Sequence, residues 1–297
     1  MKNRFLKEVI FRSAYLVLAV IALFSSMGFW GMWTGKGSGS FNVWFFTNYF
    51  DWTIVMSIFA TAFALAEDFK LYKNGDLNAY TKKYPFLKFC TFSGMIFGLI
   101  LGAAIIDRVG DLRLTDSTAY GSIYPAIATK AYWLDFSLLS TMFLCPVLYI
   151  IQYILFEEKG VTRKLYGSLG IVPPTIFYLF DKFFGIIFKA AYGGTDALIA
   201  ANKYAVAYPF FFYDNLTFHQ WWWILLWPSA FGVALMIINR SSYVISHLKR
   251  NENGKIYFDK TEPKEEDCTD MFHPLAVRIA AKKALKQGTK GKQDAKE

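Results

Sequence analysis

Long apolar runs separated by short polar segments dominate the chain. A run of about 20 apolar residues is long enough to cross about 30 Å of hydrocarbon as a helix. Six such runs occur, at approximately residues 13–32, 43–66, 87–106, 132–156, 165–188 and 220–239. The pattern therefore predicts an all-α, polytopic membrane protein with six transmembrane helices.

The fifth run is the least regular of the six. It carries Pro173 and Pro174 near its start, and Asp181 and Lys182 towards its end. A membrane helix tolerates such residues where neighbouring helices satisfy the backbone groups that a proline frees. We therefore expect this span to be kinked or re-entrant.

Lysine and arginine in the short flanking segments predict the orientation of the spans. Basic residues are dense before the first span, between the second and third, and between the fourth and fifth, whereas the other connections are poorer in them. Because such residues favour the cytoplasmic side, both termini are predicted to be cytoplasmic. The predicted organisation is a six-helix transmembrane domain over 1–247 and a basic, partly disordered cytoplasmic tail over 248–297, with a short basic amphipathic helix at 273–286.

The first apolar run follows a basic start, as the apolar region of a signal peptide does. It is longer than such a region, and the aromatic segment 28–33 resembles an interfacial anchor more than a cleavage site. We interpret it as a retained first helix.

Composition supports the membrane class, because 55% of the residues are hydrophobic and 19% are aromatic. The basic residues that give the net charge of +9 lie mostly in the segments predicted to be cytoplasmic, as expected for a membrane protein, so no nucleic-acid partner is predicted.

Cys90, Cys145 and Cys268 form neither a disulfide framework nor a zinc spacing. Lysine exceeds arginine, as in low-GC bacterial genomes. The localisation predicted is the cell membrane, with membrane lipids as partners.

The sequence contains none of the short motifs that mark the common soluble enzyme families. A P-loop, a dinucleotide-binding glycine motif, a zinc-protease motif and a nucleophile elbow are all missing. We also find no internal repeat of the kind that transporters carry. No cofactor and no metal site is therefore predicted.

Polar residues of the apolar runs gather in the predicted outer half. Taking 1.5 Å per residue, Thr47 lies about 6 Å and Asp51 about 12 Å below Val43. An ionisable side chain at that depth usually faces a protein interior or a wet cavity. The predicted site is an outward-facing polar crevice, formed by Thr47 and Asp51 and lined by Asp135, Thr141, Met142, Asp181, Asp214 and His219. Asp135 and Asp214 also suit helix caps, and His219 suits the interfacial aromatic belt.

Three aromatic stretches resemble a known family. They are Trp44 to Asp51, Cys145 to Leu148 followed by Phe156 to Gly160, and Ala207 to Asp214. Their order is similar to that in the androgen-induced six-helix membrane proteins and their bacterial relatives. The resemblance covers about residues 10–240.

In animal members, the resemblance implies a threonine hydrolase that acts on fatty-acid esters of hydroxy fatty acids. Thr47 matches the threonine of the second span. The histidine expected in the fourth span is replaced, because Thr141 and Met142 occupy the corresponding places. A threonine hydroxyl needs a base to accept its proton, and Asp51, one helical turn away, is the remaining candidate.

Three functions stay open from the sequence. The chain is interpreted as a lipid-handling protein that binds acyl chains or is a divergent ester hydrolase. Alternatively, it transports a small solute or ion, with Asp51 as a ligand and protonation site. As a third possibility, it is a structural membrane subunit in which Asp51 forms an interhelical hydrogen bond.

Overall fold

The computed structural model describes residues 2–27, 49–75, 84–111, 139–191 and 221–261. These residues are mostly helical, which confirms the predicted class in its coarse form. The long helices are α1 (Lys2–Ser26), α3 (Tyr49–Lys73), α4 (Pro85–Asp111), α8 (Cys145–Phe156), α10 (Val172–Ala191) and α12 (Trp221–Ser246). The shorter elements are the π-helix η3 (Ser140–Leu144), α9 (Lys164–Leu169), β1 (Leu248–Arg250) and β2 (Ile256–Phe258).

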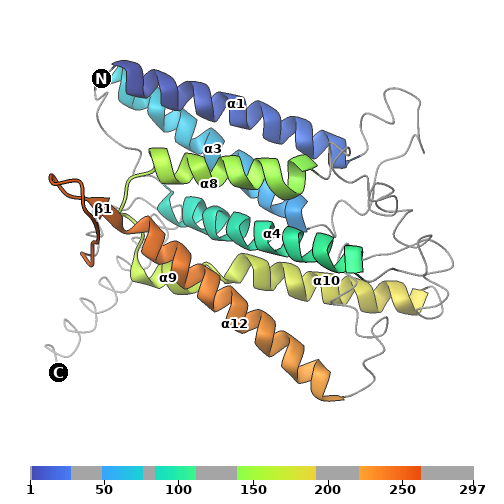
Figure 1. Ribbon diagram of the computed structural model, residues 1–297. Helices are drawn as coiled ribbons and strands as arrows, with labels where there is room; N and C mark the ends of the chain where they lie inside the picture. The colour runs from blue at the N-terminus through green and yellow to red at the C-terminus, as the bar shows by residue number, and fades with distance from the viewer. Residues whose placement is uncertain (1, 28–48, 76–83, 112–138, 192–220, 262–297) are drawn as a thin grey trace, which may run out of the picture.

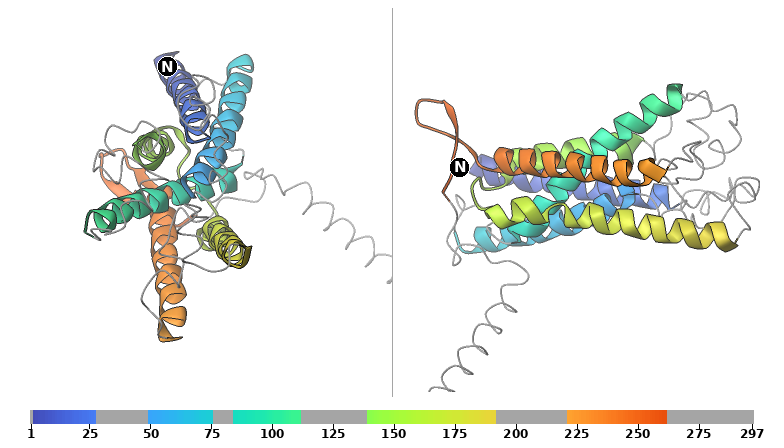
Figure 2. Two further views of the ribbon diagram at one scale, coloured as in Figure 1. Left: turned by 90° about the vertical axis from the view of Figure 1, so that its right-hand side faces the viewer. Right: turned by 90° about the horizontal axis from the view of Figure 1, so that it is seen from below.

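Successive long helices run in alternating directions along one bundle (Figure 1). α4 is its central element, in contact with α3, η3, α8, α9, α10 and α12. We call the end of the bundle that holds the start of α1 and the ends of α3 and α12 the inner end, and the opposite end the outer end. Towards its first residues, at the outer end, α12 diverges from the other helices (Figures 1 and 2).

Two described helical segments, Phe5–Ser26 and Tyr49–Lys73, are long and apolar enough to cross a membrane. Shorter apolar segments cover Pro85–Ile100, Ser140–Phe156 and Gly167–Phe180. Length and composition thus suggest membrane association.

Several helices extend past the predicted spans. α1 begins at Lys2 rather than at residue 13, and α3 continues to Lys73 rather than ending at 66. The reason is visible at Arg12 and Asp68, two charged residues that were placed outside the spans and are buried between helices instead. α4 likewise reaches Asp111 and α12 reaches Ser246.

The predicted fifth span is divided into α9 and α10. Pro173 and Pro174 lie in the first turn of α10. A helix tolerates proline there, because the backbone N–H groups of a first turn have no intrahelical acceptor and the N–H that proline lacks is not needed. Gly170 lies in the break, and a Cβ atom there would collide with the side chain of Asn239 on α12. The close approach of these two segments therefore requires glycine at 170.

The apolar core lies where α1, α3, α4 and α8 meet. Ala19 and Ala22 let α1 approach α3 closely, and Ile54 of α3 is fully buried beside them. Phe92 of α4 stacks on Tyr153 of α8 with ring centroids 4.1 Å apart. This core holds in place the polar residues described below.

A small hairpin follows α12 at the inner end, and the all-α prediction did not include it. β1 and β2 pair antiparallel, with Leu248 opposite Phe258. Phe258 contacts the rings of Tyr243 and His247, and Lys249 pairs with Asp259 at 2.7 Å. The predicted amphipathic helix at 273–286 lies outside the described residues.

Candidate functional site

The buried face of α1 carries an unusual number of polar residues. The buried residues of α1 recur every three or four positions, which places them on one face of the helix: Glu8, Arg12, Tyr15, Ala19, Ala22 and Ser26. All of them except the two alanines carry a polar group. Arg12 is fully buried at 0% exposure. A charged side chain in that setting needs partners, because an unpaired buried charge is strongly unfavourable.

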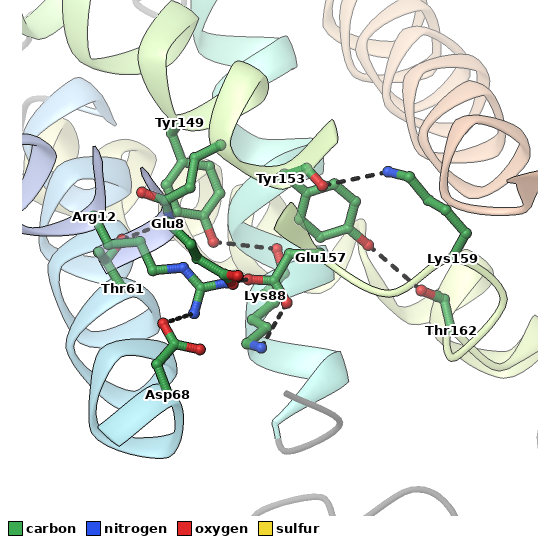
Figure 3. A network of polar contacts seen from close by, with 11 residues as sticks. Glu8, Arg12, Thr61, Asp68, Lys88, Tyr149, Tyr153, Glu157, Lys159 and Thr162 are labelled. Atoms are coloured by element: carbon green, nitrogen blue, oxygen red, sulfur yellow. Dashed lines mark hydrogen bonds and ion pairs between the residues drawn. The ribbon is translucent and has the colours of Figure 1, made fainter. Parts of the chain in front are cut away.

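Arg12 contacts three carboxylates (Figure 3). Its Nη1 donates to Asp68 Oδ2 of α3 at 2.7 Å. Its Nη2 donates to Glu157 Oε1, directly after α8, at 2.8 Å, and lies 2.8 Å from Glu8 Oε1, one turn earlier on α1. One guanidinium therefore joins α1, α3 and the end of α8.

Lys88 adds α4 to the same group. Its Nζ donates to Glu157 Oε2 at 2.6 Å, so both oxygens of this carboxylate accept from cations. Burial by itself would raise the pKa of Glu157, but Lys88 and Arg12 together hold that pKa below its ordinary value. We call Glu8, Arg12, Asp68, Lys88 and Glu157 the charge cluster.

Lys159 lies at the edge of the charge cluster. Its Nζ donates to the carbonyl oxygen of Tyr153 at 3.3 Å and lies 5.2 Å from the centre of that ring. Burial lowers the pKa of Lys159 to about 8, although the charge of Glu157 opposes this shift.

Neutral polar pairs continue from the charge cluster towards the outer end. Gln152 Nε2 of α8 donates to Thr61 Oγ1 of α3 at 3.1 Å. Tyr15 of α1 donates to Ser57 Oγ of α3 at 2.6 Å. Each pair connects two helices, which gives the interior of the bundle a series of directional contacts in addition to its apolar packing.

Asp51 lies in the first turn of α3 and is fully buried. Ser26 Oγ, at the end of α1, donates to Asp51 Oδ2 at 2.7 Å. An acidic residue in a first turn interacts favourably with the positive end of the helix dipole. Its setting is thus a helix terminus with a hydroxyl partner.

Thr141 and Met142 are both buried in η3. The N–H of Cys145 bonds to the carbonyl of Ser140, five residues earlier, which is the π-helical pattern. Pro146 follows and has no N–H to donate, so the ordinary helical ladder is interrupted at this point.

The remaining residues of the predicted crevice are not brought together by the described part of the chain. Asp181 belongs to α10. Thr47, Asp135, Asp214 and His219 lie outside the described residues. The crevice therefore stays a prediction.

Sequence reasoning missed the charge cluster. Arg12 and Lys88 were counted only as flanking charges that orient the spans, and Glu157 only as part of a motif. The spacing of Glu8 and Arg12 was the available signal, since acid and base four residues apart share one face of a helix. What could not be read from the sequence is that Asp68 and Glu157 reach the same point.

Comparison with known proteins gives no relative from which function can be transferred. No family model matches the chain, and neither a curated protein nor a solved structure matches it.

Proposed function

We propose that the chain is an integral protein of the cell membrane that has six transmembrane helices and binds lipid acyl chains along α10 and α12. Both termini would then lie in the cytoplasm, at the inner end. The alternating directions of the long helices in Figure 1 support this topology, as do the basic flanks of the predicted spans.

The observation that carries the lipid-binding proposal is the pair of apolar stripes on α10 and α12. On α10 the exposed residues recur every three or four positions, at Val172, Ile176, Leu179, Phe183 and Ile187. On α12 the exposed residues include Val233, Met236 and Ile237. Continuous apolar surface is costly in water and ordinary against lipid. All of these side chains are exposed, so neither helix covers the apolar residues of the other.

The described residues favour binding of acyl chains without hydrolysis of an ester. The resemblance places a histidine where this chain has Thr141 and Met142, and both are buried within η3. Among the described residues the one histidine is His247, which lies at the inner end beside Tyr243. Thr47 lies outside the described residues, and no described residue near the inner-end His247 matches the expected threonine–histidine pair.

Photocrosslinking in lipid nanodiscs tests the acyl-chain proposal. A phospholipid with a photoactivatable acyl chain is expected to label α10 and α12 in a saturable manner that excess unlabelled lipid prevents. The exposed stripe of α1, which includes Val17 and Ile21, is the internal control. It would contact bulk lipid and label without saturation. Equal, non-saturable labelling of all three helices would contradict a specific binding site.

Hydrolysis and topology are tested separately. Purified protein is expected to leave acyl esters and fluorophosphonate probes unchanged, and labelling that Thr47→Ala removes would instead support the hydrolase alternative. Single cysteines at 76–83 are expected to react only from the cytoplasmic side, and those at 112–138 only from outside.

A further inference from the structure

The second half of α12 has a buried face and an exposed face. Leu235, Asn239 and Ser242 are buried, and Ser93 Oγ of α4 donates to Asn239 Oδ1 at 3.4 Å. The exposed residues recur every three or four positions on the other side of the helix: Val233, Met236, Ile237, Arg240 and Val244. Packing against α4 thus sets which face is exposed, and Arg240 belongs to that face.

Arg240 stands where the apolar part of this face meets the predicted membrane boundary. It directly follows the predicted sixth span, 220–239, at the inner end. Val233, Met236 and Ile237 precede it, and each is more than half exposed. From Val233 to Arg240 the helix rises about 10 Å. An apolar stripe that ends in a cation matches, in order and polarity, the acyl chain and phosphate of a phospholipid in the inner leaflet.

The guanidinium of Arg240 is held in a defined position. It lies over the ring of Tyr243, one turn later, with Cζ 5.4 Å from the ring centre. The Tyr243 ring is itself fixed, because it is buried, contacts the ring of His247, and packs so closely on α9 that a Cβ atom at Gly167 would lie 2.9 Å from it. A guanidinium that rests on a fixed ring is prepared for a ligand at its N–H edge.

Arg240 differs from the other arginines of the described chain in its partners. Arg12 contacts three carboxylates, and Arg250 donates to the carbonyl of Gly254. Among the described residues, Arg240 has the Tyr243 ring as a partner and no carboxylate at ion-pair distance. A phosphate group fits the planar fork of arginine, and anionic lipids are abundant in the cytoplasmic leaflet of cell membranes. Charge complementarity therefore favours an anionic headgroup at this place.

We propose that Arg240 binds the phosphate of an anionic phospholipid in the inner leaflet, and that an acyl chain of this lipid lies along Val233, Met236 and Ile237. This inference rests on the acyl-chain binding proposed above and names the class of lipid. The guanidinium donates N–H groups to the phosphate oxygens while its face stays on Tyr243. A zwitterionic phospholipid also has a phosphate, but its choline cation is repelled by Arg240, so a headgroup with a net negative charge binds more tightly.

The test compares two phospholipids that have the same acyl chains, phosphatidylglycerol and phosphatidylcholine. Native mass spectrometry of the full-length protein in an uncharged detergent measures the affinity for each. We expect phosphatidylglycerol to bind about fivefold more tightly, which is the effect of one basic residue near an anionic headgroup. Arg240→Gln should remove this preference. Arg240→Lys should keep part of it, since lysine has the charge without the planar fork.

Arg250→Gln is the matched control, because it removes the same exposed charge from the hairpin at the inner end. It should keep the preference for phosphatidylglycerol. A preference that Arg240→Gln leaves unchanged, or that both glutamine variants lose equally, would overturn a site at Arg240. Displacement of the lipid by inorganic phosphate would identify a soluble anion as the ligand. A loss of stability in Arg240→Gln without a change in lipid preference would identify a carboxylate of this chain or of a second copy. Either result would also overturn the proposal.

Photolabelling of the unmodified protein gives a second measurement that depends on no variant. Phosphatidylglycerol with a photoreactive headgroup should label α12 around Arg240, and the same lipid with a photoreactive acyl chain should label it between Val233 and Ile237. Both reactions should saturate. The reverse order along α12, or headgroup labelling spread equally over the inner ends of α1 and α3, would contradict the site.

The two experiments separate this inference from the acyl-chain proposal. Saturable acyl labelling of α12 in a protein without headgroup preference would keep the acyl-chain proposal and overturn the phosphate site. A preference that depends on Arg240, without saturable acyl labelling, would support the phosphate site and overturn the acyl-chain proposal.

Discussion

The charge cluster at the inner end and the Asp51 contact at the outer end both hold a buried carboxylate against α1, but with different chemistry. Arg12 donates to Asp68 and Glu157 through charged hydrogen bonds. Ser26 donates to Asp51 through a hydroxyl at a similar distance of 2.7 Å. Removing a charged partner leaves uncompensated charge in the interior, whereas removing a hydroxyl leaves one acceptor short of a donor.

The two regions also differ in what they connect. The charge cluster joins α1, α3, α4 and the end of α8, while the hydrogen bond from Ser26 to Asp51 joins α1 and α3. Burial of a charged side chain alone thus does not identify a binding site. The number of elements that meet at the side chain, and the balance of their charges, separate a cross-linking role from a local one.

Replacing Arg12 should have the largest effect. Arg12→Leu removes the one cation that contacts all three carboxylates of the charge cluster, and it is expected to cost about 3 to 5 kcal/mol of unfolding free energy. The measurement is denaturant unfolding in mixed micelles. Lys7→Leu is the matched control, since Lys7 is exposed on the same helix. Similar losses in both variants would show that the cluster does not hold the helices together.

The second-largest loss of unfolding free energy is expected where the chain after α9 packs closely against α12, a place outside the charge cluster and the Asp51 contact. Gly170→Ala puts a methyl group into the side chain of Asn239 and is expected to cost about 1 to 3 kcal/mol through overpacking. Gly232→Ala on α12 is the control, because a Cβ atom there meets no atom within 4 Å. Unfolding free energies measured side by side should separate the two. A harmless Gly170→Ala would contradict the close packing.

Removing the hydrogen bond to Asp51 should lower the unfolding free energy by a smaller amount. Ser26→Ala removes the donor to Asp51 and is expected to cost about 1 kcal/mol by the same unfolding measurement. Ser242→Ala is the control, since this buried hydroxyl donates to Ile238 on its own helix and bonds to no other helix among the described residues. A cost as large as that of Arg12→Leu would erase the distinction between the two regions.

Replacing His247 should have the smallest effect on stability, and this effect should be measurable only at acidic pH. Burial lowers the pKa of His247 below its ordinary value, although the carbonyl of Tyr243 opposes the shift. The unfolded chain therefore binds a proton more readily, and stability is lost as pH falls below about 6.5. His247→Gln should reduce this acid loss in thermal midpoints. An unchanged acid slope would exclude His247 as its source.

The sequence predicted the helical class and an irregular, kinked or re-entrant fifth span, because hydrophobic run length and proline position are local signals. It placed Asp51 about 12 Å below Val43; residues 43–48 lie outside the described residues, so that depth stays a prediction. The charge cluster could not be predicted in the same way. Glu157 reaches Arg12 only through the packing of α1, α3, α4 and α8, and no local pattern encodes that meeting.

Arg12 also has a consequence for how the chain is made. It is synthesised 56 residues before Asp68 and 145 residues before Glu157. At about 5 to 20 residues per second, roughly 7 to 30 seconds separate its emergence from that of Glu157. During that time α1 has Glu8 as its own acidic partner one turn away. Synthesis of the first helix therefore precedes its final charge pairing, and the bundle closes around Arg12 only after α8 has been translated.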